Sequence, residues 1–547
     1  MKIPPLIAAS VMSIQSRPRT TKTKSTLKKK RLNNIYYKYI QGVFMKAPVS
    51  SAVLFALAGT AFAIPKHGID FVVGVDGDFK AAKAAAAATK TSEGSHYIIF
   101  FPNGEYNLGT LTGDGNQLTK FNTSHVSFIG ESMEGVTLFN SSIEESISKT
   151  ATLQFNTADD IYMQDLTVQN KSTTCSENAC RHVTIQQVGD KYVYKRVRLI
   201  SGQDTYYTNK GGRTYWDGGE IRGTVDFICG DGDVFFEGTK LVPTRSAAVI
   251  TAGKTTTEWG YVFNNAVIES QFNNYYLGRS WNHAKTVFLN TKMIATPEAS
   301  GWQSPINEVP IISAEYNSMN GNVQKLDLSG RRRAYTDKNG GSANLNPVLS
   351  DTEAAKYTLK NVLGGRDSWA PDKLTEQVEA PNIAQVGKSI KWADNEKALC
   401  WVVFVNGKYH SNTTDTRIGL DGITEGSKVY LRAANSMGGL GEKSNEIVTV
   451  AATDSSVTDT SATDTSTTDT STVDSIPPSP GDSVTVPGDT TVTPGDTTKV
   501  PGDTTIARIH RSHYTEQNRK QPQHLYTIKG QRIIKGRTKV MRALYGK

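Results

Sequence analysis

The amino-acid sequence predicts an all-β protein, in which a right-handed parallel β-helix is followed by a small β-sandwich. The first observation is that short apolar, strand-like pieces recur at steps of 31, 22, 20, 27 and 25 residues, centred on Val168, Leu199, Ile221, Leu241, Ile268 and Met293. Such a period, with Asn and Gly at the corners and no helical periodicity, is typical of coils stacked into a parallel β-helix. The second observation is a later set of alternating runs, WVVFVNG, SKVYLRAANS and NEIVTV, which is typical of a sandwich.

Two aspartates lie one such step apart. Asp204 and Asp226 are separated by 22 residues in the segment GQDTYYTNKGGRTYWDGGEIRGTVDFICG. Residues one coil apart on the same face lie about 4.8 Å from each other, so we expect the two carboxyl groups to be neighbours. Gln203 lies 22 residues after Arg181, and Arg279, in LGRSWN, lies about two coils beyond Asp226. We therefore expect one small surface to collect these side chains.

The expected carboxylate pair suggests hydrolytic chemistry. Two carboxylates this close cannot both ionise easily, so we expect one pKa to rise and the other to fall, which gives an acid and a nucleophile at the same pH. Arg279 would keep the anionic member ionised, and the Gln203 amide could donate a hydrogen bond to an oxyanion. These are the parts that ester hydrolysis needs.

Three motifs carry a resemblance to a known family. GQDTYY, GTVDFICG and LGRSWN resemble GxQDTLY, GTVDFIFG and LGRPW of the pectin methylesterases (carbohydrate esterase family 8, here of the secreted bacterial type), in the same order and spacing. The resemblance runs from about Phe71 to Pro371, and it includes an opening FVVGVDGDFKAAKAAAAAT and a closing EYNSMN followed by AAKYTLKNVLGG. It implies hydrolysis of galacturonate methyl esters in pectin.

The resemblance also implies a role for each site residue. Asp226 would attack the ester carbonyl, and Asp204 would protonate the departing methanol and then activate water. Gln203 would stabilise the oxyanion, and Arg279 would hold Asp226. The residues expected to contact substrate are Trp281, Tyr207, Arg181 and Phe227.

Two positions depart from the family pattern. Where the family has a glutamine in a QAVAL-like segment, this chain has RHVTI with Arg181, and Cys229 replaces an aromatic residue that lines the sugar groove. If Arg181 faces the carboxylates, it should lower the pKa of Asp204. The alternative is that it points away and pairs with a surface carboxylate.

The first 63 residues read as two segments. Residues 1–44 hold ten Lys or Arg and no Asp or Glu, which predicts a disordered basic extension or a stretch that is not translated. Residues 45–63, MKAPVSSAVLFALAGTAFA, are expected to be a signal peptide, with Met45 as the true start. We therefore expect a secreted protein, extracellular or at the cell surface, with no membrane insertion.

The four cysteines fit an oxidising compartment. Cys175 and Cys180 are close enough in sequence to close a small disulfide loop, although two free thiols are the alternative. Cys229 and Cys400 have no obvious partner, and no Cys/His set suggests zinc. We expect no metal and no cofactor.

The remaining chain divides by composition. Residues 64–373 should form the β-helix, with an alanine- and lysine-rich helix over 78–91 that either caps its open end or lies on its surface. Residues 381–450 should form the sandwich, which resembles a fibronectin type III module and would serve as a spacer or bind carbohydrate. Residues 451–505 read as an acidic disordered linker with nine Asp and one Lys, and 506–547 as a basic tail with eleven Lys or Arg and one Glu.

The distribution of charge along the chain limits which binding partners we expect. The excess of positive charge belongs to the two ends of the chain, so it does not indicate nucleic-acid binding by the body. We expect a monomer that acts on pectin (homogalacturonan), with a tail that contacts the cell surface or an acidic polysaccharide or is simply solvated. Two rival functions stay open: a polygalacturonase-like glycosidase, whose carboxyl groups would stand farther apart, and an inactive carbohydrate-binding β-helix.

Overall fold

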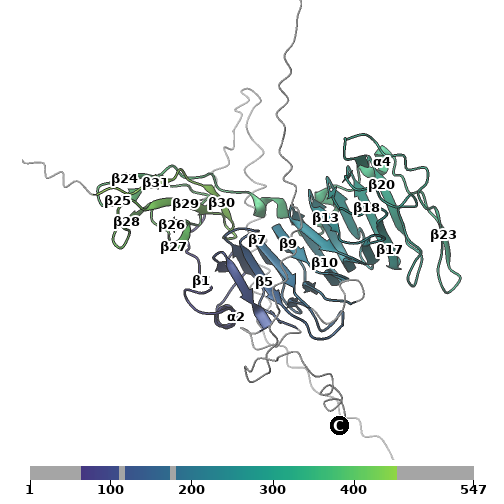
Figure 1. Cartoon of the computed structure of the whole chain (residues 1–547), viewed down its shortest axis with the longest axis horizontal. Helices are drawn as coiled ribbons and strands as arrows, with labels where there is room; N and C mark the ends of the chain where they lie inside the picture. The colour runs from purple at the N-terminus through teal and green to yellow at the C-terminus, as the bar shows by residue number, and fades with distance from the viewer. Residues whose placement is uncertain (1–62, 110–117, 173–179, 452–547) are drawn as a thin grey trace, which may run out of the picture. The chain divides into compact units, whose positions relative to one another are not determined.

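The computed structural model describes residues 63–109, 118–172 and 180–451, and its largest element is a 21-stranded sheet wound into a helix (Figure 1). Each strand pairs in parallel with the strand at the same position in the next coil. The winding produces three faces, which we call A, B and C. The predicted parallel β-helix is thus confirmed. Among the described residues, no helix is long and apolar enough to cross a membrane.

The strands divide among the three faces by their pairing, and four long strands bend from one face to the next. Face A comprises β1 (Phe71–Val72), β2 (Tyr97–Phe101), β4 (Val126–Gly130), the first parts of β7 (Ile161–Asn170) and β9 (Tyr192–Ile200), the last parts of β10 (Tyr206–Asp217) and β12 (Ile228–Glu237), β15 (Tyr261–Asn264), β18 (Lys285–Leu289) and β20 (Ile312–Tyr316). Face B comprises β3 (Gly104–Asn107), β5 (Val136–Asn140), the last parts of β7 and β9, β11 (Glu220–Gly223), β13 (Lys240–Pro243), β16 (Val267–Ile268), β19 (Lys292–Met293) and β21 (Met319–Asn320). Face C comprises β6 (Leu153–Phe155), β8 (Ile185–Gln187), the first parts of β10 and β12, β14 (Val249–Lys254) and β17 (Tyr276–Asn282).

The predicted repeat is confirmed in its register. The six apolar residues at the centres of the recurring pieces are aligned partners on face B, in the order Val168, Leu199, Ile221, Leu241, Ile268 and Met293. All six are buried in the main core. Each coil places its apolar residue above the previous one. The unequal steps between these residues therefore change only the lengths of the turns between strands.

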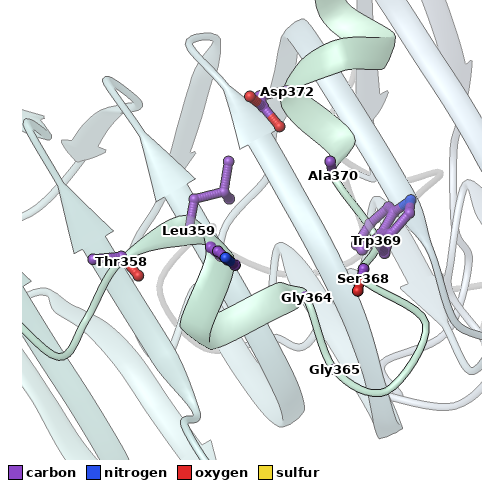
Figure 2. Close-up of a pocket in the computed structure, with 9 residues that line it drawn as sticks. Thr358, Leu359, Gly364, Gly365, Ser368, Trp369, Ala370 and Asp372 are labelled. Atoms are coloured by element: carbon purple, nitrogen blue, oxygen red, sulfur yellow. The ribbon is translucent and has the colours of Figure 1, made fainter. Parts of the chain in front are cut away.

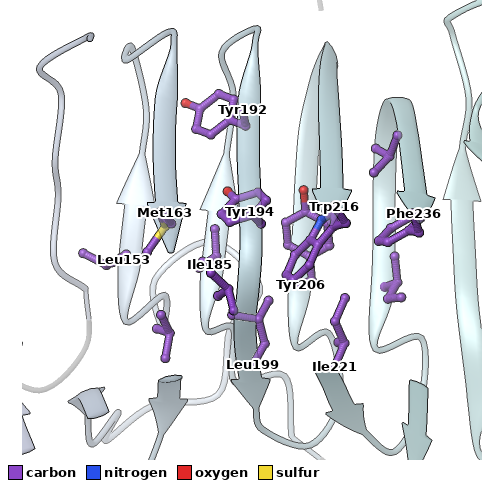
Figure 3. Close-up of a cluster of buried hydrophobic side chains, with 14 of the residues drawn as sticks. Leu153, Met163, Ile185, Tyr192, Tyr194, Leu199, Tyr206, Trp216, Ile221 and Phe236 are labelled. Atoms are coloured by element: carbon purple, nitrogen blue, oxygen red, sulfur yellow. The ribbon is translucent and has the colours of Figure 1, made fainter. Parts of the chain in front are cut away.

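Aromatic rings fill much of this core. Trp216, Phe236 and Phe263 are neighbours on successive coils, and the rings of Phe236 and Phe263 stack with centroids 4.3 Å apart. The next ring, Phe288, stacks on Phe263 at 4.4 Å. Figure 3 shows Trp216 and Phe236 among the inward-pointing side chains of neighbouring coils. Stacked rings of this kind add to the stabilisation from buried apolar area.

The predicted N-terminal helix forms as α2 (Phe79–Ala88). Asp78 caps it by accepting a hydrogen bond from the backbone N–H of Ala81 at 2.8 Å. Phe79, Ala82 and Ala86 are buried in the main core, where Phe79 contacts three phenylalanine rings of the first coils. Of the two interpretations of this helix, the end cap is therefore the one that fits.

The chain leaves the β-helix through short elements and enters a module of antiparallel strands. The connecting elements are the hairpin β22 (Ala334–Thr336) and β23 (Ser342–Asn344), the helices α4 (Asp351–Ala354) and α5 (Leu359–Leu363), and a 3₁₀ turn, η1 (Pro371–Thr375). One sheet of the module contains β24 (Ala384–Val386), β25 (Ser389–Lys391) and β28 (Arg417–Gly419). The other contains β26 (Cys400–Val405), β27 (Lys408–Thr413), β29 (Lys428–Ala434), β30 (Leu440–Lys443) and β31 (Ile447–Val448). Both sheets contribute to one buried apolar cluster, whereas the likeness to fibronectin type III and the domain boundaries stay predictions.

The module also packs against the β-helix. Outward-facing residues of face A, such as Phe100 and Tyr162, share a buried cluster with Val402 and Phe404 of β26. The Arg432 guanidinium donates to the backbone oxygen of Glu131 at 2.7 Å. A free-standing spacer does not account for this interface, because the module covers apolar surface that the β-helix would otherwise expose.

Several predicted segments lie outside the described residues. These are the basic extension, nearly all of the signal peptide, the acidic linker and the basic tail. Cys180 is disulfide-bonded, Cys229 and Cys400 are free, and Cys175, the predicted partner of Cys180, lies outside the described residues.

Candidate active site

Asp204 and Asp226 occupy the same turn of successive coils, just before the first residues of β10 and β12. Both have a left-handed backbone, with φ of 59° and 50°, which Asp tolerates better than most residues. The Asp204 N–H donates to the carbonyl of Val225 at 3.1 Å, which fixes one turn above the other. The strands that follow pair in register from Tyr206 and Ile228 onward. The predicted stacking of the two aspartates is therefore confirmed.

Arg279 reaches this pair from two coils away. On face C, Cys229, Ala252 and Arg279 are aligned partners in β12, β14 and β17. Because the side chain of Ala252 is short, the Arg279 side chain can extend back over it. Its Nε lies 2.8 Å from Oδ1 of Asp226 and its Nη2 lies 2.5 Å from Oδ2. This bidentate contact fixes the orientation of the Asp226 carboxylate.

A groove of about 260 Å³ opens over these groups. It is lined by Ile147, Arg181, Gln203, Asp204, Asp226, Cys229, Ala252, Arg279, Trp281 and Ile306. All four predicted catalytic residues and two of the predicted substrate contacts thus line one surface. Tyr207 packs beside Trp281, with ring centroids 6.4 Å apart, in the small apolar cluster that lies along the groove.

Phe227 does not belong to this surface. Its side chain has no exposed area and lies in the main core. The prediction that it contacts substrate is wrong, because at this corner the chain turns Phe227 inward while Asp226 faces the groove. Cys229 is the outward residue of this stretch, and it is buried among the groove's apolar side chains.

Burial raises the pKa of both carboxyl groups, but their charged neighbours differ. Burial and the negative charge of Asp226 raise the pKa of Asp204 to about 8, although Arg181 and Arg279 oppose the rise. Burial also raises the pKa of Asp226, while the hydrogen bonds and charge of Arg279 hold it down. The expected fall for Asp226 is therefore wrong in direction, because burial outweighs the arginine. The two aspartates still differ in their causes, since the charge of Asp226 helps to raise the pKa of Asp204, whereas the bound guanidinium of Arg279 lowers the pKa of Asp226.

Arg181 fits both interpretations that the sequence left open, because it pairs with another carboxylate and also faces the groove. Its guanidinium forms a two-pronged ion pair with Glu145, with Nη2 2.9 Å from Oε2 and a shorter contact from Nε to Oε1. It nevertheless lines the groove, and its charge lowers the pKa of Asp204. The predicted stacking of Arg181 beside Gln203 is confirmed by a parallel bridge between them.

Comparison with known families decides the assignment of this chain. A family model described as Pectinesterase matches residues 70–366, which is more than half of the 547-residue chain. The chain belongs to the pectinesterase family. The matched region of this pectinesterase-family chain contains every groove residue named above.

Individual relatives cover the chain to different extents. Pectinesterase 1 of Olea europaea is 35% identical over 31% of this chain and 48% of that protein, and Pectinesterase A of Dickeya chrysanthemi is 26% identical over 53% of this chain and 87% of that protein. A solved pectin methylesterase from Erwinia chrysanthemi is 22% identical, covers 55% of this chain and 97% of its own, and aligns with a TM-score of 0.43. The chain matches three plant pectinesterases over only 22%, 36% and 48% of their length.

Sequence reasoning missed several residues at the groove of this pectinesterase-family chain. Glu145 pairs with Arg181 from 36 positions earlier, Lys254 lies with its Nζ 5.7 Å from the ring centroid of Trp281, and Ile147 and Ile306 line the wall. Only Lys254 had a signal that could have found it, since it lies at the end of a strand of the same face as Arg279. The others come from turns whose length varies between coils.

A larger hollow of about 450 Å³ lies beside α5 (Figure 2). Figure 2 shows Leu359 and Trp369 on opposite sides of it. Its charged lining residues are Lys360 and Asp372, so it holds a single carboxyl group. The carboxylate pair, and not the volume, therefore identifies the groove as the candidate active site.

Proposed function

We propose that this protein hydrolyses the methyl esters of galacturonate in pectin, releasing methanol and de-esterified pectin. The observation that carries the proposal is the pairing of Asp226, bound by Arg279 through two nitrogens, with Asp204, whose pKa is raised to about 8, in one open groove of a pectinesterase-family chain. The proposal includes two inferences from the sequence, namely that the protein is of the secreted bacterial type and that it acts outside the cell.

The first half of the reaction uses both aspartates. A carboxylate oxygen of Asp226 forms a bond to the ester carbonyl carbon, and the carbonyl electrons move to its oxygen, which accepts a hydrogen bond from the Gln203 amide. As the bond from carbon to the methoxy oxygen breaks, Asp204 transfers its proton to that oxygen and methanol departs. The product is an acyl-enzyme on Asp226 beside an ionised Asp204.

The second half restores the enzyme. Asp204, now a carboxylate, takes a proton from water as the water oxygen bonds to the acyl carbon. The bond to Asp226 breaks, which frees galacturonic acid and regenerates ionised Asp226 and protonated Asp204. The new carboxyl group then loses its proton to solvent. Arg279 holds the Asp226 carboxylate in position at the start and at the end of the cycle.

The groove suits a sugar chain that carries both ester and acid groups. Trp281 and Tyr207 offer aromatic surface for sugar rings, and Ile147 and Ile306 offer apolar walls for the ester methyl. Lys254 and Arg181 supply positive charge for carboxylates of neighbouring residues. We therefore propose pectin as the partner.

The direct test is methanol release from highly methylated pectin by the purified full-length chain with EDTA present. We expect methanol without new reducing ends. New reducing ends would indicate the glycosidase, a requirement for calcium would indicate a lyase, and binding without either product would indicate a carbohydrate-binding protein.

A pair of substitutions tests how the groove sets the pKa of Asp204. Arg181→Gln removes a positive charge that lowers this pKa and leaves Glu145, which raises it. The alkaline limb of the kcat/KM profile should therefore move to higher pH. Glu145→Gln removes the raising charge and should move the limb to lower pH.

The opposite signs are the control for this pair, because general damage to the groove would not shift the limb in both directions. Both shifts should diminish at high salt, since the ion pair is partly exposed. Superimposable pH profiles for the wild type and both variants would show that the charges of Arg181 and Glu145 do not affect the pKa of Asp204.

A further inference from the structure

A second group of titratable side chains lies on face A, away from the groove. His96, His125 and Asp160 immediately precede β2, β4 and β7, which pair in register from their first residues. The three residues therefore stand on successive coils, one above the other. The mechanism proposed above uses none of them.

Their side chains converge on one point. Nε2 of His96 lies 3.0 Å, and Nδ1 of His125 lies 2.8 Å, from the same carboxylate oxygen of Asp160. All three potential ligand atoms lie within 4.8 Å of one another. The His96 and Asp160 side chains are 1% and 9% exposed, and that of His125 is 28% exposed, which leaves a path from solvent.

The surrounding structure holds these groups in place. The carbonyl of His125 accepts from the Tyr97 N–H at 3.0 Å, and the Asp160 N–H donates to the carbonyl of Asp190 at 2.9 Å. The other ring nitrogen of His96, Nδ1, lies 3.0 Å from the hydroxyl of Ser127. A hydroxyl can accept a hydrogen bond from Nδ1 and so leave the Nε2 lone pair free, as a metal-bound histidine requires.

We propose that His96 Nε2, His125 Nδ1 and an Asp160 carboxylate oxygen bind one divalent transition-metal ion of the zinc type. Two imidazoles and a carboxylate suit zinc and its neighbours, whereas calcium and magnesium prefer oxygen ligands. Ligands about 2.0–2.1 Å from a tetrahedral zinc ion stand roughly 3.4 Å apart, so the two contacts to Asp160, at 3.0 and 2.8 Å, need to open by only about half an ångström. Solvent beside His125 supplies the fourth ligand as water.

The expected effect is on stability and not on turnover. The site ties together three early coils on face A, whereas the groove lies at the turns that lead into face C on later coils. A ligand that binds the folded chain and not the unfolded one raises the free energy of unfolding. Zinc should therefore delay unfolding without entering the reaction.

The test uses the full chain, stripped with EDTA and then titrated with zinc chloride. We expect close to one bound zinc ion per chain, a rise of about 2 °C or more in the midpoint of thermal unfolding at saturating zinc, and unaltered methanol release. His125→Asn and Asp160→Asn should each abolish the midpoint shift and the bound ion. Asparagine tolerates the left-handed backbone of both positions, which have φ of 57° and 54°, so both variants should fold.

His67→Asn is the matched control, because His67 is exposed and pairs with Asp70 outside the cluster. It should bind zinc as the wild type does. Zinc binding that persists unchanged in His125→Asn would place the ion elsewhere, and a wild type that binds no zinc would overturn the proposal. Cobalt in place of zinc provides a spectroscopic check, since its visible absorption should appear in the wild type and disappear in His125→Asn.

Discussion

Replacing Asp226 with asparagine should reduce methanol release by at least about a hundredfold while the fold is kept. The amide has nearly the same shape, but it lacks the negative charge and the nucleophilic oxygen that would bond to the ester carbon. Arg279 would also lose the anion that it binds through two nitrogens, at 2.8 and 2.5 Å. The measurement is the initial rate of methanol release at several pectin concentrations.

Asp217→Asn is the matched control for this substitution. Asp217 is also a carboxylate in an ion pair, with Lys195 at 2.9 Å, but it is less buried than Asp226 and lies on face A and not in the groove. Its amide variant should keep the wild-type rate. If Asp226→Asn turned over pectin at a rate close to the wild type, the assignment of the nucleophile would be wrong.

Replacing Asp204 with asparagine should cost at least about a hundredfold at neutral pH, because the amide can neither protonate the leaving methanol nor activate water. In the wild type, burial and Asp226 raise the pKa of Asp204 to about 8, so kcat/KM should decline above that pH as the acid loses its proton. The residual activity of Asp204→Asn should lack this decline. A residual profile with the same alkaline limb would assign the acid to another group.

The same pKa shift predicts an effect on stability. A carboxyl whose pKa is raised by folding stabilises the native state fully below its unfolded pKa of about 3.9, and this contribution is lost as the pH rises through the folded pKa. For Asp204 the loss runs up to about pH 8. Asp204→Asn should therefore unfold at a higher temperature than the wild type at pH 8, and the difference should vanish below about pH 4. Equal unfolding temperatures at pH 8 would contradict the burial-driven shift.

The sequence by itself determined the coil repeat and the positions stacked along it. In a parallel β-helix, the residue one period later occupies the same place on the next coil, so spacing alone placed Asp226 above Asp204 and Gln203 beside Arg181. The same reasoning aligned the six apolar centres of face B. The position of Arg279 near the pair was predictable as well, because counting whole coils along the sequence placed it about two coils beyond Asp226.

Contacts across turns could not be counted in this way. Glu145 meets Arg181 through a turn whose length no repeat fixes. His125 does stack above Asp160 in register, but on early coils that precede the repeat recognised in the sequence. The inward direction of Phe227 depends on how the corner before β12 is turned. The packing of the module on face A joins residues that are hundreds of positions apart.

The tertiary structure alone also decided the electrostatics. The sequence showed which charges would lie near one another, and it therefore predicted a rise for one aspartate and a fall for the other. It could not show how completely both would be removed from water. Because the cost of ionising a carboxyl group depends on that burial, the pKa of Asp226 rises in spite of Arg279, and the pKa of Asp204 rises to about 8 in spite of both arginines.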